Sequence, residues 1–100
     1  MEETTMKKIT LFYLQNCPYC HNAKKALEEL IKENPEYSEI SVEWIEESQQ
    51  PELAEQYDYY YVPAIFLGNM KLYEANPSED YAACKKNVQA ALDAVRGNKE

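Results

Sequence analysis

The sequence predicts an α/β fold with the element order β-α-β-α-β-β-α, in which a four-stranded mixed sheet is flanked by three helices. Two observations carry this prediction. Short apolar, β-rich runs alternate with helical patterns through the first half of the chain, and a hairpin pattern followed by an amphipathic helix fills the second half. Strands joined by a helix are expected to be parallel. The 100 residues suit a single domain, with a loose N-terminus over residues 1–6.

The first half of the chain predicts two strands around one helix. Residues 7–14 form an apolar run typical of a buried strand, and residues 39–46 alternate apolar and polar side chains like a second strand. Between them, Asn16 is expected to cap a helix that has Pro18 in its first turn and ends at Pro35. One face of this helix carries an apolar stripe made of Ala23, Ala26, Leu27, Leu30 and Ile31.

The next segments predict a short helix and a hairpin. An early proline, Pro51, favours a short helix within residues 48–57. Residues 59–74 are typical of a β-hairpin, because two β-rich runs flank Gly68-Asn69. The two strands of this hairpin are expected to complete the sheet.

The last helix is expected to start with a capping box. Asn76 is a good cap, Pro77 fits the first helical position, and Glu79 follows the cap by three residues. Gly97 ends the helix. Its apolar face carries Tyr81, Cys84, Val88, Ala91, Leu92 and Val95.

Composition and charge narrow the class of function. A net charge of −8 argues against nucleic acid and anionic membranes as partners. No apolar run approaches the ~18 residues that a membrane span needs. The N-terminus begins acidic and its apolar run is too short for a signal peptide, so we expect a cytoplasmic protein. In that compartment cysteines stay reduced unless they are transient or catalytic.

The stretch NCPYCHN holds two of the three cysteines and the only histidine. The spacing of Cys17 and Cys20 can serve a redox disulfide, half of a zinc site or, with His21, a haem attachment point. Cys17 lies where a strand gives way to a helix, and the N–H groups of a helix N-terminus favour an anion such as a thiolate. A disulfide that closes so small a loop restrains the unfolded chain weakly, which suits a reversible switch better than a structural cross-link.

The phase of the helix gives the two cysteines different roles. Cys20 is in register with the apolar stripe and is expected to point inward, whereas Cys17 lies one turn earlier at the exposed end. We therefore expect Cys17 to attack a disulfide and Cys20 to resolve the mixed disulfide. Pro18 is expected to stiffen the turn between them, and Tyr19 to line the exposed rim of the site.

At this point the chain resembles a glutaredoxin of the thioredoxin-fold superfamily. CPYC is the usual dithiol glutaredoxin motif, CPYCHNAKKAL continues like the first helix of that family, and YVPAIFLG resembles its TVPxIFIG segment. The resemblance runs from about residue 7 to 96. It implies a thioredoxin fold, thiol–disulfide exchange through Cys17 and Cys20, and a cis Pro63 against the disulfide. It also implies that the backbone of Val62 pairs with an extended substrate as one more strand.

The resemblance further implies partners. The substrates would be disulfide-bearing proteins or glutathione mixed disulfides, and glutathione would be the candidate electron donor. We expect a monomer with no bound cofactor and no metal. The alternative within the same class is a glutaredoxin-shaped, thioredoxin-like reductant that is served by a flavoprotein resembling thioredoxin reductase.

The chain departs from the family pattern where glutathione would bind. Tyr73 and Glu74 stand in place of a glycine pair, and Asn76 stands in place of an acidic residue. Tyr61 occupies a position where threonine is common, and Leu14 replaces the usual Lys or Arg three residues before the first cysteine. Glu74 is expected to repel the carboxylates of glutathione. Tyr61, Glu74 and Asn76 are therefore candidate contacts for glutathione or for a different substrate.

Rival interpretations assign the cysteines to a metal. Haem attachment fits the pattern C-x-x-C-H, but it needs export, and no signal is visible. Zinc needs about four ligands. An iron–sulfur cluster bridges some glutaredoxins, although the proline in CPYC disfavours it; a non-catalytic metal or cluster module thus stays as an alternative. His21 is out of phase with the apolar stripe and is expected to be solvated, and Cys84 is expected to lie in the core.

The tyrosine-rich run YDYYYVP, residues 57–63, leaves two interpretations open. In the first, the tyrosines pack at a strand edge and keep their hydroxyl groups wet. In the second, they form an aromatic surface beside the dithiol that holds a protein or peptide substrate.

Overall fold

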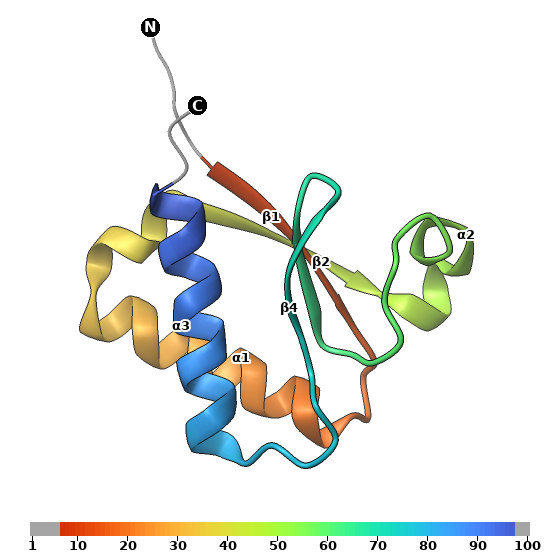
Figure 1. The fold of residues 1–100 in the computed structure, drawn as a ribbon, viewed down its shortest axis with the longest axis horizontal. Helices are drawn as coiled ribbons and strands as arrows, with labels where there is room; N and C mark the ends of the chain where they lie inside the picture. Colours follow the sequence, from red (N-terminus) through yellow and green to blue (C-terminus); the bar gives the residue numbers. More distant parts are fainter. Residues whose placement is uncertain (1–6, 98–100) are drawn as a thin grey trace, which may run out of the picture.

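The computed structural model describes residues 7–97, so the predicted loose N-terminus over residues 1–6 lies outside the described residues. The fold is a four-stranded sheet with the strand order β2-β1-β3-β4, and its helices lie beside the sheet (Figure 1). The main elements are β1 (Lys7–Tyr13), α1 (Pro18–Glu33), β2 (Ile40–Glu46), α2 (Pro51–Ala54), β3 (Ala64–Leu67), β4 (Met70–Glu74) and α3 (Tyr81–Gly97). Short 3-10 turns follow α1 and β2.

The sheet is mixed, as predicted. β1 pairs with β2 in parallel over its whole length, and β3 pairs antiparallel with both β1 and β4. The predicted hairpin turns at Gly68, which has a φ of 60°. Glycine adopts this backbone angle without the steric penalty that other residues have. Its first strand is shorter than predicted, because the residues before Ala64 leave the sheet and form a loop.

Two apolar clusters cover the two faces of the sheet. On one face, α1 and α3 lie side by side, and the predicted stripes of both helices pack against β1, β3 and β4, with only Ile31 and Tyr81 partly buried. On the other face, a smaller cluster forms around Phe12 and Phe66, under the short α2 and the tyrosine-rich loop. The sheet therefore carries its long helices on one side and a thin cover on the other.

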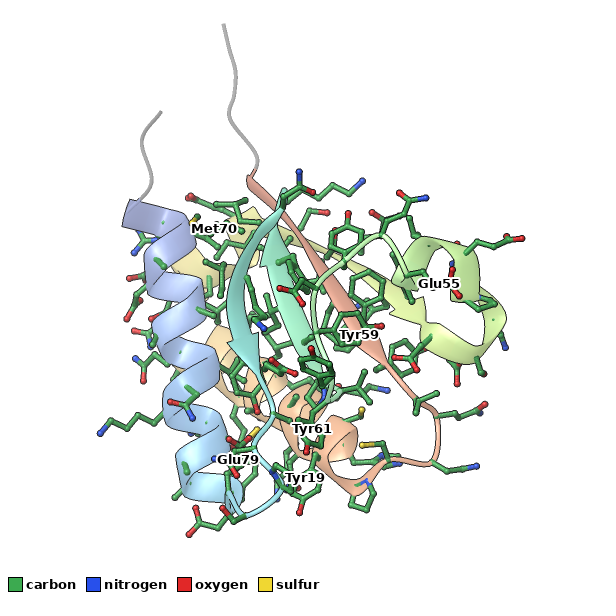
Figure 2. The ribbon with its side chains drawn as sticks, turned by 45° about the vertical axis from the view of Figure 1, so that its right-hand side comes forward. Tyr19, Glu55, Tyr59, Tyr61, Met70 and Glu79 are labelled. Atoms are coloured by element: carbon green, nitrogen blue, oxygen red, sulfur yellow. The ribbon has the colours of Figure 1, made fainter. Side chains whose placement is uncertain are left out.

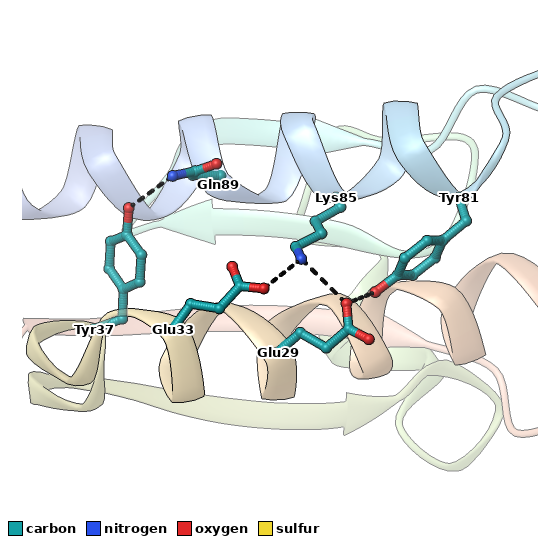
Figure 3. A network of polar contacts seen from close by, with 6 residues as sticks. All are labelled: Glu29, Glu33, Tyr37, Tyr81, Lys85 and Gln89. Atoms are coloured by element: carbon teal, nitrogen blue, oxygen red, sulfur yellow. Dashed lines mark hydrogen bonds and ion pairs between the residues drawn. The ribbon is translucent and has the colours of Figure 1, made fainter.

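Polar contacts tie α1 to α3 above the first cluster (Figure 3). Lys85 of α3 pairs with Glu29 (3.2 Å) and Glu33 (2.9 Å) of α1. The Tyr81 hydroxyl donates a hydrogen bond to Glu29 at 2.6 Å. These pairs are partly exposed, so they fix the alignment of the two helices more than they add to stability.

The ends of two helices differ from the prediction. α3 starts at Tyr81, and the Asp80 carboxylate accepts the N–H of Ala83 (2.9 Å) as its cap. Asn76 instead closes a turn by accepting the N–H of Ser78 (3.0 Å). The predicted capping box at Asn76 was therefore wrong, because the asparagine bonds its own local backbone. Asn16 does not cap α1 either; Cys17 occupies that position.

No helix within residues 7–97 is long and apolar enough to cross a membrane.

Candidate active site

Cys17 lies at the junction of β1 and α1. It is the N-cap residue of α1, with extended backbone angles, and Pro18 takes the first helical position. The Cys17 carbonyl accepts the N–H groups of Cys20 and His21, both at 3.1 Å. No side chain caps this helix end. The strand-to-helix turn thus presents a thiol, half-exposed, at the N-terminus of a sixteen-residue helix.

Cys20 lies one turn further along α1 and is buried, with 6% of its surface exposed. Burial raises the pKa of its thiol to about 12, with a smaller rise from contact with the Cys17 thiol, although the N–H of Leu14 opposes the shift by donating to Cys20 Sγ at 3.4 Å. The structure thus gives the two cysteines the inward and outward positions that helical phase predicted. His21 is exposed, as expected.

The loop before β3 brings a backbone carbonyl to the outer thiol. The Val62–Pro63 peptide bond is cis, as the resemblance implied, and Pro63 is buried. The Cys17 thiol approaches the Val62 carbonyl oxygen, with an Sγ–O separation of 3.7 Å. The Pro63 carbonyl accepts the N–H of Ala75 at 3.0 Å, which holds the loop against the end of β4.

Tyr19 and Tyr61 lie at the same end of the molecule (Figure 2). The Tyr19 side chain is half-buried, and its hydroxyl donates to the carbonyl of Pro77, so it ties the start of α1 to the loop after β4. Asn76, in that loop, is exposed. All the residues predicted for the site except the buried Cys20 and Pro63 reach the surface at least in part.

The tyrosine-rich loop divides between the two interpretations. Tyr57 and Tyr59 pack on the Phe12 ring, with ring centroids 4.8 and 5.0 Å apart, so these two cover the smaller cluster and are partly buried. Tyr60 and Tyr61 are 85% and 53% exposed. The loop therefore anchors itself with the first pair and presents the second pair beside Val62.

Glu74 connects this loop to the sheet. Its Oε2 accepts the N–H groups of Tyr60 (2.6 Å) and Tyr61 (2.8 Å), and its Oε1 accepts from Lys71 Nζ (2.7 Å). Partial burial opposes ionisation of Glu74, but hydrogen bonds from Lys71, Tyr60 and Tyr61 outweigh it and lower the pKa of the carboxyl. The sequence marked Glu74 as a repulsive charge and missed these bonds, because nothing in a linear sequence shows that Tyr60 faces it.

Glu46 is a second residue that sequence reasoning missed. Its Oε2 accepts the N–H of Gln15 (3.0 Å), and its Oε1 accepts the N–H of Ser48 (2.7 Å). A hydrogen bond from the Ser48 hydroxyl lowers the pKa of Glu46 most, and these backbone hydrogen bonds lower it further. They also fix the segment that leads into Cys17. One feature of the sequence could have indicated Glu46. It is the last residue of a strand predicted to run parallel to β1, so it lies beside the end of β1.

One hollow reaches the dithiol, and a second lies in the neighbouring loop region. A groove of about 740 Å³ passes Cys20 between α1 and β2 and is lined in part by Tyr13 and Trp44, whose rings meet edge to face. A smaller hollow of about 300 Å³ lies between the exposed tyrosines and the end of β4. Within residues 7–97, no three His, Cys, Asp or Glu side chains gather where they would hold one metal ion.

Comparisons with known proteins point to one superfamily. The glutaredoxin family model matches residues 9–71, a span that includes Cys17, Cys20 and Pro63 and stops before Glu74. A thioredoxin from Methanocaldococcus jannaschii is 37% identical over 60 residues, which cover 60% of this chain and 68% of that protein.

Two solved structures share the fold. A mutant thioredoxin from Halobacterium salinarum superposes with a TM-score of 0.54 and 20% identity, over 87% of this chain and 75% of that one. A malarial protein superposes with a TM-score of 0.61 and 13% identity, over 91% and 98%. At these identities the likeness shows the thioredoxin fold, and the four-stranded mixed sheet agrees with it.

Proposed function

Since the chain belongs to the glutaredoxin family, we propose that it reduces disulfides of proteins and of small molecules through a dithiol made of Cys17 and Cys20. The observation that carries the proposal is the contrast between these two thiols. One is half-exposed at a helix N-terminus, and the other is buried one turn away and in contact with it. This arrangement supplies an attacking group and a resolving group in one motif.

The proposed reaction transfers two electrons from the dithiol to the substrate. The Cys17 thiolate attacks one sulfur of the substrate disulfide, which forms a mixed disulfide and releases the other sulfur as a thiolate. Cys20 then attacks Cys17 Sγ, its proton passes to the released thiolate, and the second substrate sulfur leaves. The products are a Cys17–Cys20 disulfide, one substrate thiol and one substrate thiolate.

The burial of Cys20 orders these steps. A thiol whose pKa is raised to about 12 stays protonated near neutral pH and does not compete with Cys17 for the substrate. Its position against Cys17 makes its attack on the mixed disulfide intramolecular. The Val62 carbonyl beside Cys17 offers a backbone partner for an extended substrate strand.

The electron donor has two candidates. Glutathione is the donor that the family suggests. A flavoprotein disulfide reductase is the second candidate, which the similarity to an archaeal thioredoxin and the carboxylate of Glu74 beside the site favour.

The first test follows the thiols by intact mass. The reduced protein is mixed with a disulfide-bonded protein such as insulin, and with glutathione disulfide in a separate experiment. We expect the parent chain to lose the mass of its two thiol hydrogens, Cys20→Ser to retain a mixed disulfide, and Cys17→Ser to stay unchanged. Cys84→Ser is the control and should behave like the parent, because that thiol is 1% exposed. Oxidation of the Cys17→Ser variant at the parent rate would contradict the proposal.

A further inference from the structure

A carboxylate site lies beside the dithiol, and the carboxylate in it belongs to the chain itself. Two consecutive backbone N–H groups, those of Tyr60 and Tyr61, and the Lys71 ammonium all donate to Glu74 within 2.8 Å. Adjacent amide donors together with an ammonium are groups that proteins use to bind anions. The next residue, Val62, contacts the Cys17 thiol through its carbonyl. The site is therefore one residue removed from the contact with the attacking sulfur.

An irregularity in the β3–β4 ladder assembles this site. Ile65 pairs with Tyr73, but the next residue, Phe66, pairs with Lys71, which leaves one extra residue in β4. In a regular strand, residues three apart point to opposite faces. The bulge places Lys71 and Glu74 on the same face of the sheet, where their charged groups meet. In the neighbouring strand, Phe66 pairs with Lys71 and Ala64 pairs with Glu74.

The site is open to a ligand of limited size. The hollow of about 300 Å³ is lined by the ends of the loop and of β4. The Glu74 side chain retains 19% of its exposure and that of Lys71 retains 36%, so solvent reaches both charges. The lining residues are Tyr60, Tyr61, Glu74, Ala75, Asn76 and Pro77.

We propose that Glu74 is a built-in occupant of this carboxylate site and thereby determines which disulfides reach Cys17. A small disulfide that would place its own carboxylate on the N–H groups of Tyr60 and Tyr61 must first displace one that is already bound there. That exchange gains no hydrogen bonds and brings two carboxylates together. Disulfides without a carboxylate at this position, including those of proteins, do not have to displace Glu74, so their reaction with Cys17 is not slowed. The inference rests on the proposed exchange at Cys17 and names its substrate class.

Glu74→Ala tests the proposal because it removes the occupant and leaves the donors. Rates of Cys17 oxidation are measured in the Cys20→Ser background with glutathione disulfide, which carries carboxylates, and with hydroxyethyl disulfide, which carries none. We expect Glu74→Ala to raise the rate with glutathione disulfide about tenfold, the effect of one charge-assisted hydrogen bond, and to leave the rate with hydroxyethyl disulfide within about twofold.

Two matched variants separate the site from net charge. Asp58→Asn removes the same unit of charge from an exposed position near Lys71 and leaves the amide donors unchanged. It should therefore raise the rate with glutathione disulfide by less than half as much as Glu74→Ala does. Adding Lys71→Ala to Glu74→Ala removes the cation and should abolish most of the gain. If Glu74→Ala fails to fold, Glu74→Gln gives a smaller gain in the same direction, because a neutral amide competes less with a ligand carboxylate.

Binding of S-methylglutathione, which cannot exchange, gives a readout that does not depend on the reaction. Its addition should shift the amide NMR signals of Tyr60 and Tyr61 in the Glu74→Ala variant and leave them in place in the parent. Equal gains in Glu74→Ala and Asp58→Asn, or equal losses with both disulfides, would overturn the inference. Absence of both a rate gain and a shift would overturn it as well. Failure of the proposed function would look different, since no disulfide would then react at Cys17 in any variant.

Discussion

Two thiols separated by two residues have different surroundings in this molecule. Cys17 is partly exposed at the start of α1, whereas Cys20 is buried and its Sγ accepts a hydrogen bond from the N–H of Leu14. Helical phase was enough to predict this difference, because a side chain in register with a buried stripe must itself turn inward. The role of Glu74 could not be predicted, since it depends on a loop that folds back over the end of β4 and on a bulge that sequence does not mark.

Alkylation of the reduced protein should follow this difference in burial. We expect iodoacetamide near neutral pH to modify Cys17 first, and to modify Cys20 and Cys84 at least tenfold more slowly, because both are buried and burial raises the pKa of both thiols. Mass spectrometry of peptides after timed quenching measures the order. Denaturant should abolish it. Faster labelling of Cys20 than of Cys17 would contradict the assignment of roles.

The pKa of Cys20 also predicts a dependence of stability on pH. Below the unfolded pKa, near 9.0, the thiol is protonated in both states and its contribution is complete. Between about 9 and about 12 the unfolded chain ionises while the folded protein holds its proton, so the free energy of unfolding falls as pH rises.

Urea unfolding of the reduced parent and of Cys20→Ala measures this effect. Buried tyrosines such as Tyr73, whose pKa is also raised by burial, act in the same direction in both proteins. The difference between the two proteins isolates Cys20. We expect the parent to lose more stability than Cys20→Ala between about pH 8.5 and about pH 10.5. Parallel curves would mean that the thiol is not held protonated.

At the scale of the elements, the long helices were predicted closely and their ends were not. The apolar stripe of α1 and the apolar face of α3 match the buried residues of each helix except at Ile31 and Tyr81, which are only partly buried. The start of α3 was placed too early, because both Asn76 and Asp80 are good caps and only the folded chain shows which one bonds a helical N–H. Propensity names the candidates, and tertiary structure selects between them.

A cavity in the α1–α3 layer should be costly. Leu30 is 1% exposed within the larger cluster, so Leu30→Ala should lower the free energy of unfolding by about 2–5 kcal/mol. Ile31→Ala is the control, because that side chain is only partly buried and its loss should cost less. Urea titration of both variants measures the comparison. Equal costs would show that the larger cluster does not surround Leu30 more closely than Ile31.

The cap of α3 makes a second prediction at this scale. Asp80→Ala should cost about 0.5–2 kcal/mol, since it leaves the N–H of Ala83 without its partner. Asn76→Ala should leave the helix intact and loosen only the turn at Ser78. Amide hydrogen exchange in the first turn of α3 distinguishes the two variants. A larger increase in exchange for Asn76→Ala would restore the capping box that the sequence predicted.

The whole molecule carries a net charge of −8, which acts on every approaching substrate regardless of the local site. Salt screens this field over about 10 Å at 0.1 M ionic strength. With the Cys20→Ser variant, we expect added salt to slow the reaction with cystamine, a cationic disulfide, and to speed the reaction with glutathione disulfide. The rate with hydroxyethyl disulfide should stay constant. Stopped-flow rate constants over a salt series test this, and equal responses to salt would contradict it.

The contact between Glu74 and the loop before Val62 has a consequence for the history of such proteins. Codons for glutamate and glycine differ at a single base, so one point mutation is enough to remove the Glu74 carboxylate. If the carboxylate governs access to Cys17, one point mutation changes how fast the protein reacts with small anionic disulfides. Preference for a redox partner can then change between close relatives while the dithiol and the fold stay the same.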